Sequence, residues 1–564
     1  MRSSRHIGLG GLVISVVLLL SVNVAGAQQP RRDAEDFDLG RAIEILSNIM
    51  YEFDTQYVDS VSSADMLSSA VAGMTKATDP YSEYLSEQSM ESFEVMTTGK
   101  YGGVGSLIRK KGDYVIFAQP YKGSPADEAG VKVGDKILSI DGKDMKGAMP
   151  DVISSHLKGD PESDVEVVIE RNFDGSVDTL TIRRRRIAIP SVPYAGIIRD
   201  GIGYICHNDF IDGSYDEMRR HLESLMATDS LRGLVLDYRS NGGGVMQEAV
   251  DIASLFLPRS ERVVSIMGRD SSSLQHFATT HAPLAEQLPV VILVSGSSAS
   301  ASEILAGVLQ DTDRAVVMGQ RTYGKGLVQG TRYVGYNSYL KYTTAKYYIP
   351  SGRCIQSRDY ASRRSDGSVG VVPDSLINEY ATRAGRKVYD GGGIVPDVKV
   401  EPQYVSRFAV TLYAMGYIED WADDYMRRHA TDSIDIRSFT LSDEEYENFV
   451  EYIAQKDVPY ESETRRAIAS LEKALENDLY DQTLGEAVAQ IKERVKDDKL
   501  SNMRTYKDEI VDILISEILT RYAYNEAALE YAAVHDDLVS QAVELLLNGD
   551  EYRRILREQD LTMH

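Results

Sequence analysis

The stretch Val290-Val-Ile-Leu-Val294-Ser295-Gly-Ser-Ser-Ala-Ser300-Ala-Ser-Glu-Ile-Leu305 decides the fold of the central part of the chain. Its apolar run predicts a buried strand, its small residues predict a turn, and the residues after Ser300 predict a helix. A serine at this junction lies where unpaired backbone N–H groups and the helix dipole favour negative charge. The position suits a nucleophile whose attack creates an oxyanion, but a serine that only caps the helix would have the same sequence.

The surrounding sequence alternates strand and helix patterns from 187 to about 402, which predicts an α/β layer structure. The expected strands are 201–205, 231–237, 290–294 and 315–318, and the expected helices are 216–226, 247–256 and 301–309. Helical spacing of apolar residues also covers 33–95 and returns after 403, whereas 98–186 contains short strands punctuated by glycine. We therefore expect a multidomain α/β protein.

A second strand–turn–helix stretch contains Asp237-Tyr-Arg-Ser-Asn-Gly242-Gly243-Gly244. Glycines let backbone N–H groups approach a ligand closely, so this turn can present an oxyanion hole. A phosphate-binding loop would need a Lys-Ser/Thr pair, which is missing here. A plain tight turn is the alternative interpretation.

Lys325 lies between glycines in Gly324-Lys325-Gly326-Leu-Val-Gln329. Such a lysine is usually a solvated loop charge, but apolar neighbours would lower its pKa and let the neutral amine act as a general base. None of the 9 histidines falls in the serine or glycine motifs, and none makes the His-Glu-x-x-His zinc pattern. A histidine-based triad through His207 or His276 is the alternative to a lysine base.

Length, charge and cysteine content restrict the class of protein. The 564 residues suggest three or four domains. The 86 acidic residues exceed the 61 basic ones, and a formal charge of −25 disfavours a general nucleic-acid binder. Only Cys206 and Cys354 are present, so neither a disulfide framework nor a four-cysteine zinc site is expected.

The N-terminus has the three-part layout of a secretory signal peptide. Arg2 and Arg5 are followed by an apolar stretch, roughly 12–24, and then by Ala25-Gly26-Ala27. We expect an exported protein whose mature chain begins near Gln28. It would be periplasmic in a Gram-negative bacterium and extracellular otherwise; an uncleaved anchor is the alternative.

Taken together, these segments resemble the C-terminal processing peptidases, also called tail-specific proteases, over roughly residues 40 to 402. The motifs that carry the resemblance follow the family's order: Asp79-Pro-Tyr-Ser-Glu-Tyr-Leu85, Tyr101-Gly-Gly-Val-Gly105 through Asp141-Gly142, the turn 237–244, the serine run, Gly324-Lys-Gly326, Tyr347-Tyr-Ile-Pro-Ser-Gly-Arg353 and Gly393-Ile-Val-Pro-Asp397. The resemblance implies an α/β superhelical (crotonase/ClpP-like) catalytic core with an inserted PDZ domain. The boundaries that we expect are a signal peptide 1–27, an N-terminal helical segment 28–97, the PDZ domain 98–186, the peptidase core 187–402 and an acidic helical C-terminal extension 403–564.

The resemblance also implies the site residues. Ser300 is the nucleophile, Lys325 the base and Gln329 the residue that orients the lysine, and the oxyanion hole is formed by backbone N–H groups, those of Gly243 or Gly244 and of Ala301. Asp311 belongs to the family motif. Because it follows Ser300 by 11 residues on one predicted helix, at a distance of about 16 Å, we expect it to be structural support.

The chain departs from the family pattern at two of these motifs. The family usually has proline where Gly242 stands, and it often has serine where Cys354 stands.

The expected activity is that of an exported serine endopeptidase that needs no metal or organic cofactor. Its partners would be proteins or peptides with free C-terminal tails, held by strand addition at a PDZ loop of Gly102, Gly103, Val104 and Gly105, with Leu107 beside the side-chain pocket. The PDZ domain would also gate access to Ser300. The extension after 403 would cap the core, form a homo-oligomer or dock an adaptor; a solvated helical appendage is the alternative.

Two other classes of protein are alternatives to a peptidase. One is a secreted PDZ-containing adaptor with an inactive hydrolase core, which the presence of both Ser300 and Lys325 disfavours. The other is a hydratase or isomerase of the acyl-CoA type, which the export signal and the PDZ segment disfavour.

Overall fold

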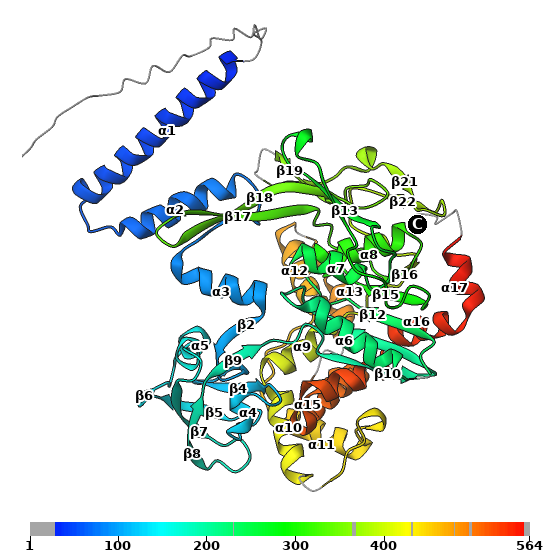
Figure 1. Cartoon of the computed structure of the whole chain (residues 1–564). Helices are drawn as coiled ribbons and strands as arrows, with labels where there is room; N and C mark the ends of the chain where they lie inside the picture. Colours follow the sequence, from blue (N-terminus) through cyan, green and yellow to red (C-terminus); the bar gives the residue numbers. More distant parts are fainter. Residues whose placement is uncertain are drawn as a thin grey trace, which may run out of the picture. The chain divides into compact units, whose positions relative to one another are not determined.

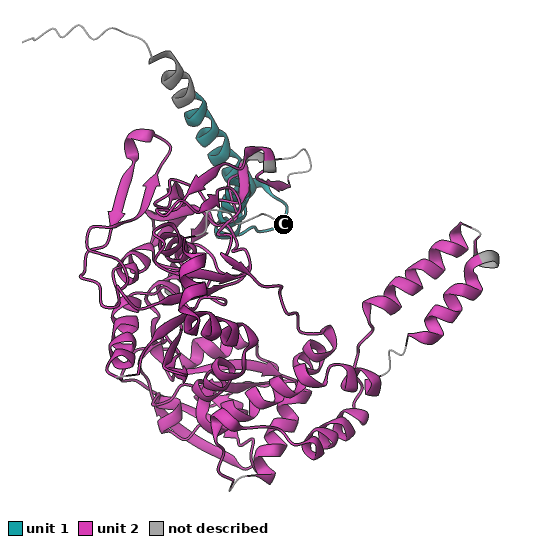
Figure 2. Cartoon of the chain, turned by 90° about the vertical axis from the view of Figure 1, so that its right-hand side faces the viewer, with its two compact units in different colours: residues 1–77 teal, residues 78–564 magenta. Residues whose placement is uncertain are grey.

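The computed structural model describes residues 29–228, 230–363, 368–429, 432–478, 480–495 and 499–557. The predicted signal peptide, 1–27, lies outside these residues. Among the described helices, none combines the length and the apolar character that a membrane span requires. The chain divides into two compact units, Met1–Ala77 and Thr78–His564 (Figure 2).

The described part of the first unit is helical. It contains α1 (Gln29–Gln56) and α2 (Ser63–Lys76). Ser62 caps α2, since its hydroxyl accepts a hydrogen bond from the Asp65 N–H. Along α1, the apolar side chains of Ile43 and Phe53 are exposed.

The second unit begins with a departure from the predicted helices of 33–95. Glu83–Leu85 forms a short strand, β1, which pairs antiparallel with β18 (Ser338–Tyr348), and helix α3 (Glu87–Thr98) follows. A strand forms here because Leu85 is buried and Lys341 of β18 lies opposite Glu83 as a cross-strand charge pair.

A six-stranded sheet forms the centre of the second unit (Figure 1). All its neighbouring strands are parallel except the first pair. In spatial order the strands are β10 (Tyr194–Arg199), β11 (Ile202–Cys206), β12 (Gly233–Asp237), β15 (Val290–Val294), β16 (Val316–Gly319) and β23 (Val398–Lys399). The predicted α/β fold is confirmed in its mixed α/β character.

Helices cover both faces of this sheet, which is why its strands are continuously apolar. On one face, Leu234 and Ile292 join a core with α6 (Ser214–Met226), α7 (Met246–Ala253) and α8 (Ala301–Asp311). On the other face, the alternate residues Val235 and Val291 pack against α16 (Asp537–Leu547) and the adjoining α17 (Gly549–Ile555). Helices α16 and α17 therefore complete the core of the central sheet.

A second sheet contains β17, the strand that begins two residues after Lys325. Its order is β1-β18-β13-β14, and β17 also pairs with β18. The remaining strands of this region are β13 (Arg262–Met267), β14 (Gln275–Ala278), β17 (Leu327–Gly335), and the pairs β19 (Arg358–Arg363) with β20 (Val369–Val371) and β21 (Glu379–Ala381) with β22 (Lys387–Tyr389).

The PDZ segment has its own antiparallel sheet and core. The sheet order is β3-β4-β5-β7-β8, and β3 is an edge strand beside α5. Strands β2 and β9, one at each end of the segment, pair with each other and connect it to the rest of the unit. The elements are β2 (Lys100–Gly103), β3 (Ser106–Lys111), β4 (Tyr114–Pro120), α4 (Pro125–Glu128), β5 (Lys136–Ile140), β6 (Lys143–Asp144), α5 (Pro150–Leu157), β7 (Asp164–Glu170), β8 (Val177–Arg183) and β9 (Arg185–Ala188).

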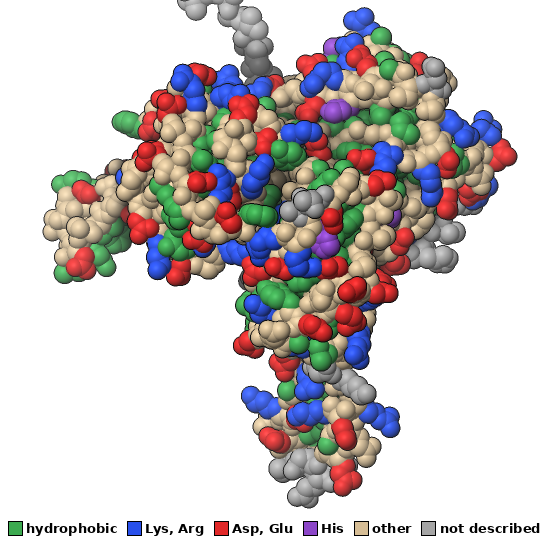
Figure 3. Space-filling model, turned by 90° about the horizontal axis from the view of Figure 1, so that it is seen from below, with side chains coloured by type: hydrophobic (Ala, Val, Ile, Leu, Met, Phe, Trp, Pro, Cys, Tyr) green, Lys and Arg blue, Asp and Glu red, His purple; other side chains and the backbone are tan. Residues whose placement is uncertain are grey.

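The C-terminal part is helical, as predicted. Most of its helices share a core around Trp421, Phe449 and Leu514, whereas α12 and α13 pack on each other as a hairpin that extends from the unit (Figure 2). Acidic and basic side chains are interspersed over the face seen in Figure 3. The helices before α16 are α9 (Arg407–Ala414), α10 (Tyr417–Arg428), α11 (Asp443–Ala454), α12 (Glu463–Asn477), α13 (Asp481–Arg494), α14 (Lys499–Thr505) and α15 (Lys507–His535).

Substitution of Leu546 in α16 should destabilise the whole second unit. Leu546 is buried among side chains of the central sheet, so we expect Leu546→Ala to lower the free energy of unfolding by about 2–5 kcal/mol. Leu471→Ala, on the exposed side of α12, is the matched control and should change it by less than about 0.5 kcal/mol. Urea unfolding measures both; equal midpoints would contradict a structural role of α16 in the core of the central sheet.

Candidate active site

One pocket of about 530 Å³ contains most of the residues that the sequence predicted to be catalytic. Ser300, Lys325, Gln329, Gly243 and Gly244 all line it. Ala301 follows Ser300 as the first, buried residue of α8. Segments that lie more than 80 residues apart in the sequence, counting from Gly243 to Lys325, thus meet in one cavity.

Ser300 differs from the other serines of its loop. The hydroxyls of Ser295, Ser298 and Ser302 donate to the backbone carbonyls of Arg239, Tyr238 and Asn241, respectively, and so attach the loop to the glycine turn. Ser300 instead lines the pocket and has a backbone φ of 55°, a value that non-glycine residues rarely adopt. Such strain is typical of functional positions that the surrounding structure holds in place.

The glycine turn lies directly against the backbone of Ser300. A Cβ atom on Gly243 would come within 2.7 Å of the Ser300 Cβ, so only glycine fits there. The Gly243 N–H already donates to the side-chain oxygen of Asn241, at 2.8 Å. Among the described residues, the N–H groups of Gly244 and Ala301 have no hydrogen-bond acceptor, and Gly244 lines the pocket.

The side chain of Lys325 is partly buried. Burial lowers the pKa of its amine, and the nearby positive charge of Lys341 lowers it further, while the negative charges of Glu303 and Asp79 act in the opposite direction. The amine lies over the ring of Tyr81, 4.5 Å from its centroid. A lowered pKa increases the fraction of neutral amine near neutral pH, which a general base requires.

A buried carboxylate that the sequence analysis did not assign joins the segments of Ser300 and Lys325. One oxygen of Glu303 accepts hydrogen bonds from the backbone N–H of Ser300, at 2.8 Å, and of Lys325, at 2.9 Å. The other accepts from the Gly324 N–H and the Thr322 hydroxyl. Burial raises the pKa of Glu303 to about 7, although all four hydrogen bonds favour the ionised form.

Tyr347 connects the same two segments from another side. Its buried hydroxyl lies within hydrogen-bonding reach of the backbone carbonyls of Ser300, at 3.1 Å, and of Lys325. The predicted motif 347–353 therefore has a role that its sequence did not indicate. Glu303 contacts the N–H groups and Tyr347 the carbonyls, so the backbones of Ser300 and Lys325 are fixed to each other.

Gln329 and Asp311 make their hydrogen bonds with residues other than Lys325. Gln329 lines the pocket from β17, and its amide donates to the Thr343 hydroxyl at 3.2 Å. Asp311 lies at the last position of α8, where it forms a fully buried ion pair with Arg353 at 2.8 Å and accepts from the Ser351 N–H. Asp311 does not line the pocket of Ser300; its predicted role as structural support stays a prediction.

His207, His276 and both cysteines lie outside this pocket. His207 is buried between aromatic rings, which lowers its pKa to about 3, and His276 is hydrogen-bonded to the Ser265 hydroxyl. Neither lines the pocket of Ser300. Cys206 and Cys354 are both free thiols, and the described residues contain no cluster of three metal-ligating side chains.

The PDZ segment has a separate groove between β3 and α5, of about 360 Å³. Val104 and Leu107 line it, and Leu107 is 51% exposed; their role in peptide binding stays a prediction. Gly102 and Gly103 belong instead to β2, paired with β9. The turn of Val104 and Gly105 follows, and within the described residues its two N–H groups have no acceptor. An edge strand beside such a turn can take up a peptide tail.

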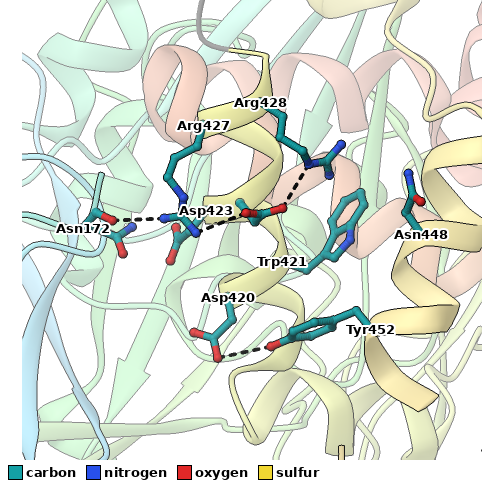
Figure 4. A pocket seen from close by; sticks show the side chains of 9 residues that line it. Asn172, Asp420, Trp421, Asp423, Arg427, Arg428, Asn448 and Tyr452 are labelled. Carbon is teal, nitrogen blue, oxygen red and sulfur yellow. Dashed lines mark hydrogen bonds and ion pairs between the residues drawn. The ribbon is translucent and has the colours of Figure 1, made fainter. Parts of the chain in front are cut away.

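A polar recess of about 590 Å³ lies between the PDZ segment and helices α10 and α11 (Figure 4). At its edge, Arg427 donates to the Asn172 carbonyl. The edge strand β3 is attached to the same helix through ion pairs of Arg109 with Glu419 and of Lys111 with Asp420.

Comparison with known proteins supports the interpretation of this pocket. Three family profiles match: "Peptidase family S41" at residues 201–375, "PDZ domain" at 116–171 and "Probable PDZ-protease, C-terminal helical domain" at 408–546. The last match extends the family likeness beyond residue 402, where we expected it to end.

Similar proteins carry related names. A "Probable CtpA-like serine protease" of Staphylococcus aureus is 31% identical, covering 66% of this chain and 72% of its own length. A "Carboxy-terminal-processing protease" of Bartonella bacilliformis is 32% identical, covering 58% and 72%, respectively. The solved structure of a photosystem II D1 C-terminal processing protease is 27% identical, covers 61% of this chain and 83% of its own, and has a TM-score of 0.34.

Glu303→Gln should damage the site although it preserves size. The amide would place one NH₂ donor against backbone N–H groups that now face a carboxylate oxygen, so at least one buried donor would lose its acceptor. We expect a loss of about 1–3 kcal/mol in the free energy of unfolding and reduced reactivity of Ser300. Urea unfolding and acylation by a serine-directed probe measure the two effects. Glu286→Gln, on the surface, is the control, and equal behaviour of both variants would contradict the role of Glu303.

Proposed function

Because this chain belongs to peptidase family S41, and is therefore a serine-type peptidase with a PDZ domain, we propose that a Ser300–Lys325 dyad carries out its peptide cleavage. The observation that supports the dyad most directly is that Ser300 and a partly buried lysine of lowered pKa line one pocket. Gln329 lines the same pocket and is the proposed orienting residue.

In this mechanism Lys325 acts first as base and then as acid. The neutral amine takes the proton of the Ser300 hydroxyl while the oxygen attacks the peptide carbonyl carbon. The protonated amine then gives this proton to the leaving nitrogen, the C–N bond breaks, and an acyl-enzyme remains. The same amine then takes a proton from a water molecule, whose oxygen attacks the acyl carbon. As the C–O bond to Ser300 breaks, the ammonium returns this proton to the Ser300 oxygen, and the product leaves.

The oxyanion of the tetrahedral intermediate would be held by backbone N–H groups. We assign this role to Gly244 and Ala301, since the Gly243 N–H is already bonded to Asn241. Gly243 would act by allowing the close approach of the turn to Ser300. Each such donor is worth roughly 2.7–4 kcal/mol of transition-state stabilisation in a comparable site.

The proposed substrates are exported proteins or peptides with free C-terminal tails. Tails would add to the edge of β3, with the carboxylate at the N–H groups of Val104 and Gly105. Residues 1–27 begin with positive charges, continue with an apolar stretch and end with small residues. This layout of a signal peptide supports export. We propose the finer crotonase/ClpP-like description of the core on the family resemblance, and an oligomeric or adaptor-binding role for the helical segments.

The alternative function is that of a PDZ-containing adaptor with an inactive core. In such a core, Ser300 or Lys325 would lack the surrounding contacts that catalysis requires. The strained Ser300 backbone and the four hydrogen bonds of Glu303 favour an enzyme, since an inactive core would have no need to hold these residues in place.

Ser300→Ala and Lys325→Ala should each abolish cleavage while the fold is retained. Neither side chain supports the buried core, so urea unfolding should change little. Mass spectrometry of peptides left after incubation of a tailed substrate with each protein gives the activity, the cut site and the tail dependence together. Cleavage that persisted in either folded variant would reject the dyad and favour a different base.

We propose further that the PDZ domain gates the pocket. Phe93 and Met96 of α3 line the pocket of Ser300, and α3 continues through Gly99 into β2 of the PDZ connection. The tail-binding strand β3 also holds the ion pairs of Arg109 and Lys111 with α10. A tail that adds to β3 would therefore act on the contact with α10 and on α3 at the same time.

Lys111→Glu should weaken this gate. A carboxylate at 111 would face Asp420 and Asp423, and the repulsion should free β3 from α10. We expect cleavage of a peptide without a suitable tail to rise by a factor of roughly 2 to 5, so that the rates with and without tail converge. Lys132→Glu, on an exposed loop of the same domain, is the control. An unchanged ratio of the two rates in Lys111→Glu would show that the contact has no part in gating.

A further inference from the structure

The motif Asp79-Pro-Tyr-Ser-Glu-Tyr-Leu85 has no role in the mechanism so far, yet it lies beside the base. Its third residue, Tyr81, places its ring under the Lys325 amine, with 4.5 Å between the amine nitrogen and the ring centroid. The face of an aromatic ring attracts a cation and gains little from a neutral amine. The ring therefore discriminates between the two protonation states through which the base must pass.

We propose that Tyr81 is a positioning residue that stabilises the Lys325 ammonium formed when the amine takes the Ser300 proton. The inference rests on the proposed dyad and adds a third member to it. In triads with histidine, a carboxylate holds and stabilises the protonated base. Here the face of a neutral ring does so, and Gln329, which the resemblance assigns to orienting the lysine, donates its amide to Thr343.

Several contacts hold the ring in this position. The Tyr81 N–H donates to the Asp79 carboxylate at 2.9 Å, and the Tyr360 ring packs edge-on against the Tyr81 ring. The hydroxyls of Tyr323 and Tyr360 each lie 3.4 Å from the Tyr81 hydroxyl. Burial, together with these hydroxyls, raises the pKa of Tyr81, so the phenol stays neutral and only its ring can act on the ammonium.

The charged groups around Lys325 come from three elements. Glu303 of α8 and Asp79 before β1 favour the ammonium, whereas Lys341 of β18, itself paired with Glu83, disfavours it. The Tyr81 ring also favours the ammonium. Since kcat/KM requires the neutral amine, it should rise with pH through the lowered pKa of Lys325 and then level off. Removal of the ring should move this rise to lower pH and lower the plateau, because the ammonium of the transition state loses its support.

The test weakens the attraction of the ring face for a cation in steps, while the shape of the side chain stays nearly constant. Position 81 is occupied in turn by Tyr, Phe, 4-fluoro-, 3,5-difluoro- and 3,4,5-trifluorophenylalanine, and kcat/KM for a tailed peptide is measured against pH. We expect Tyr81→Phe to stay near wild type and each further fluorine to lower the plateau, with a total loss on the order of 10-fold. Tyr81→Leu should lose at least as much and shift the rise to lower pH.

Controls separate this inference from the dyad. Tyr333→Leu removes an exposed ring of β17 that contacts Tyr339 and does not line the pocket of Ser300, and it should keep the position of the pH-dependent rise. A plateau independent of fluorination, or an unmoved rise in a folded Tyr81→Leu, would overturn the role of Tyr81 even if the dyad is correct. If Ser300→Ala or Lys325→Ala retains cleavage, the dyad fails, and with it the inference.

Discussion

The bifurcated contact of one Glu303 oxygen with the N–H groups of Ser300 and Lys325 is the interaction on which the site depends. The two residues come from different elements, the N-terminus of α8 and the loop before β17, and nothing in local structure requires these elements to keep a fixed distance. A buried ionised carboxylate is costly unless its hydrogen bonds are satisfied, and here four donors satisfy it. A shift of either segment would leave a donor or a carboxylate oxygen without its hydrogen-bond partner. Because an unpaired buried polar group is costly in free energy, the four hydrogen bonds hold the two segments in place.

The remaining polar contacts of the site extend this principle to the glycine turn. Three serines of the 295–302 loop donate to carbonyls of 238–241, and Asn241 in turn accepts from the Gly243 N–H. Hydrogen-bonded polar residues therefore surround a strained Ser300. The strain of a positive φ, on the order of 1–3 kcal/mol, can persist because so many contacts determine the backbone around it.

Much of the fold could be predicted because its signals are local. Continuous apolar strands such as 290–294 and the break at the serine run define the central sheet without reference to distant residues. The residues that the sequence analysis missed depend on distant partners: Tyr81 and Tyr347 meet Lys325 only after folding. Glu303 was detectable, since it stands three residues after Ser300 in the capping-box pattern, but the pattern alone indicates a helix start and not a link to Lys325. The strand at Glu83–Leu85 was missed because its pairing partner, β18, lies some 250 residues away in the sequence.

In the proposed dyad, the electrostatics of Lys325 balance two opposite requirements. A base must be neutral before the reaction and must hold a proton during it, so its pKa has to lie near the working pH and not far below it. Burial and Lys341 alone would favour the neutral amine at the expense of the ammonium. Glu303, Asp79 and the Tyr81 ring act in the other direction, and because the pKa of Glu303 is itself raised to about 7, its negative charge is fully present only above neutral pH. At lower pH the amine would become protonated while this carboxylate loses its charge, so the two titrations are coupled, and the activity of the site should follow the pair and not the lysine alone.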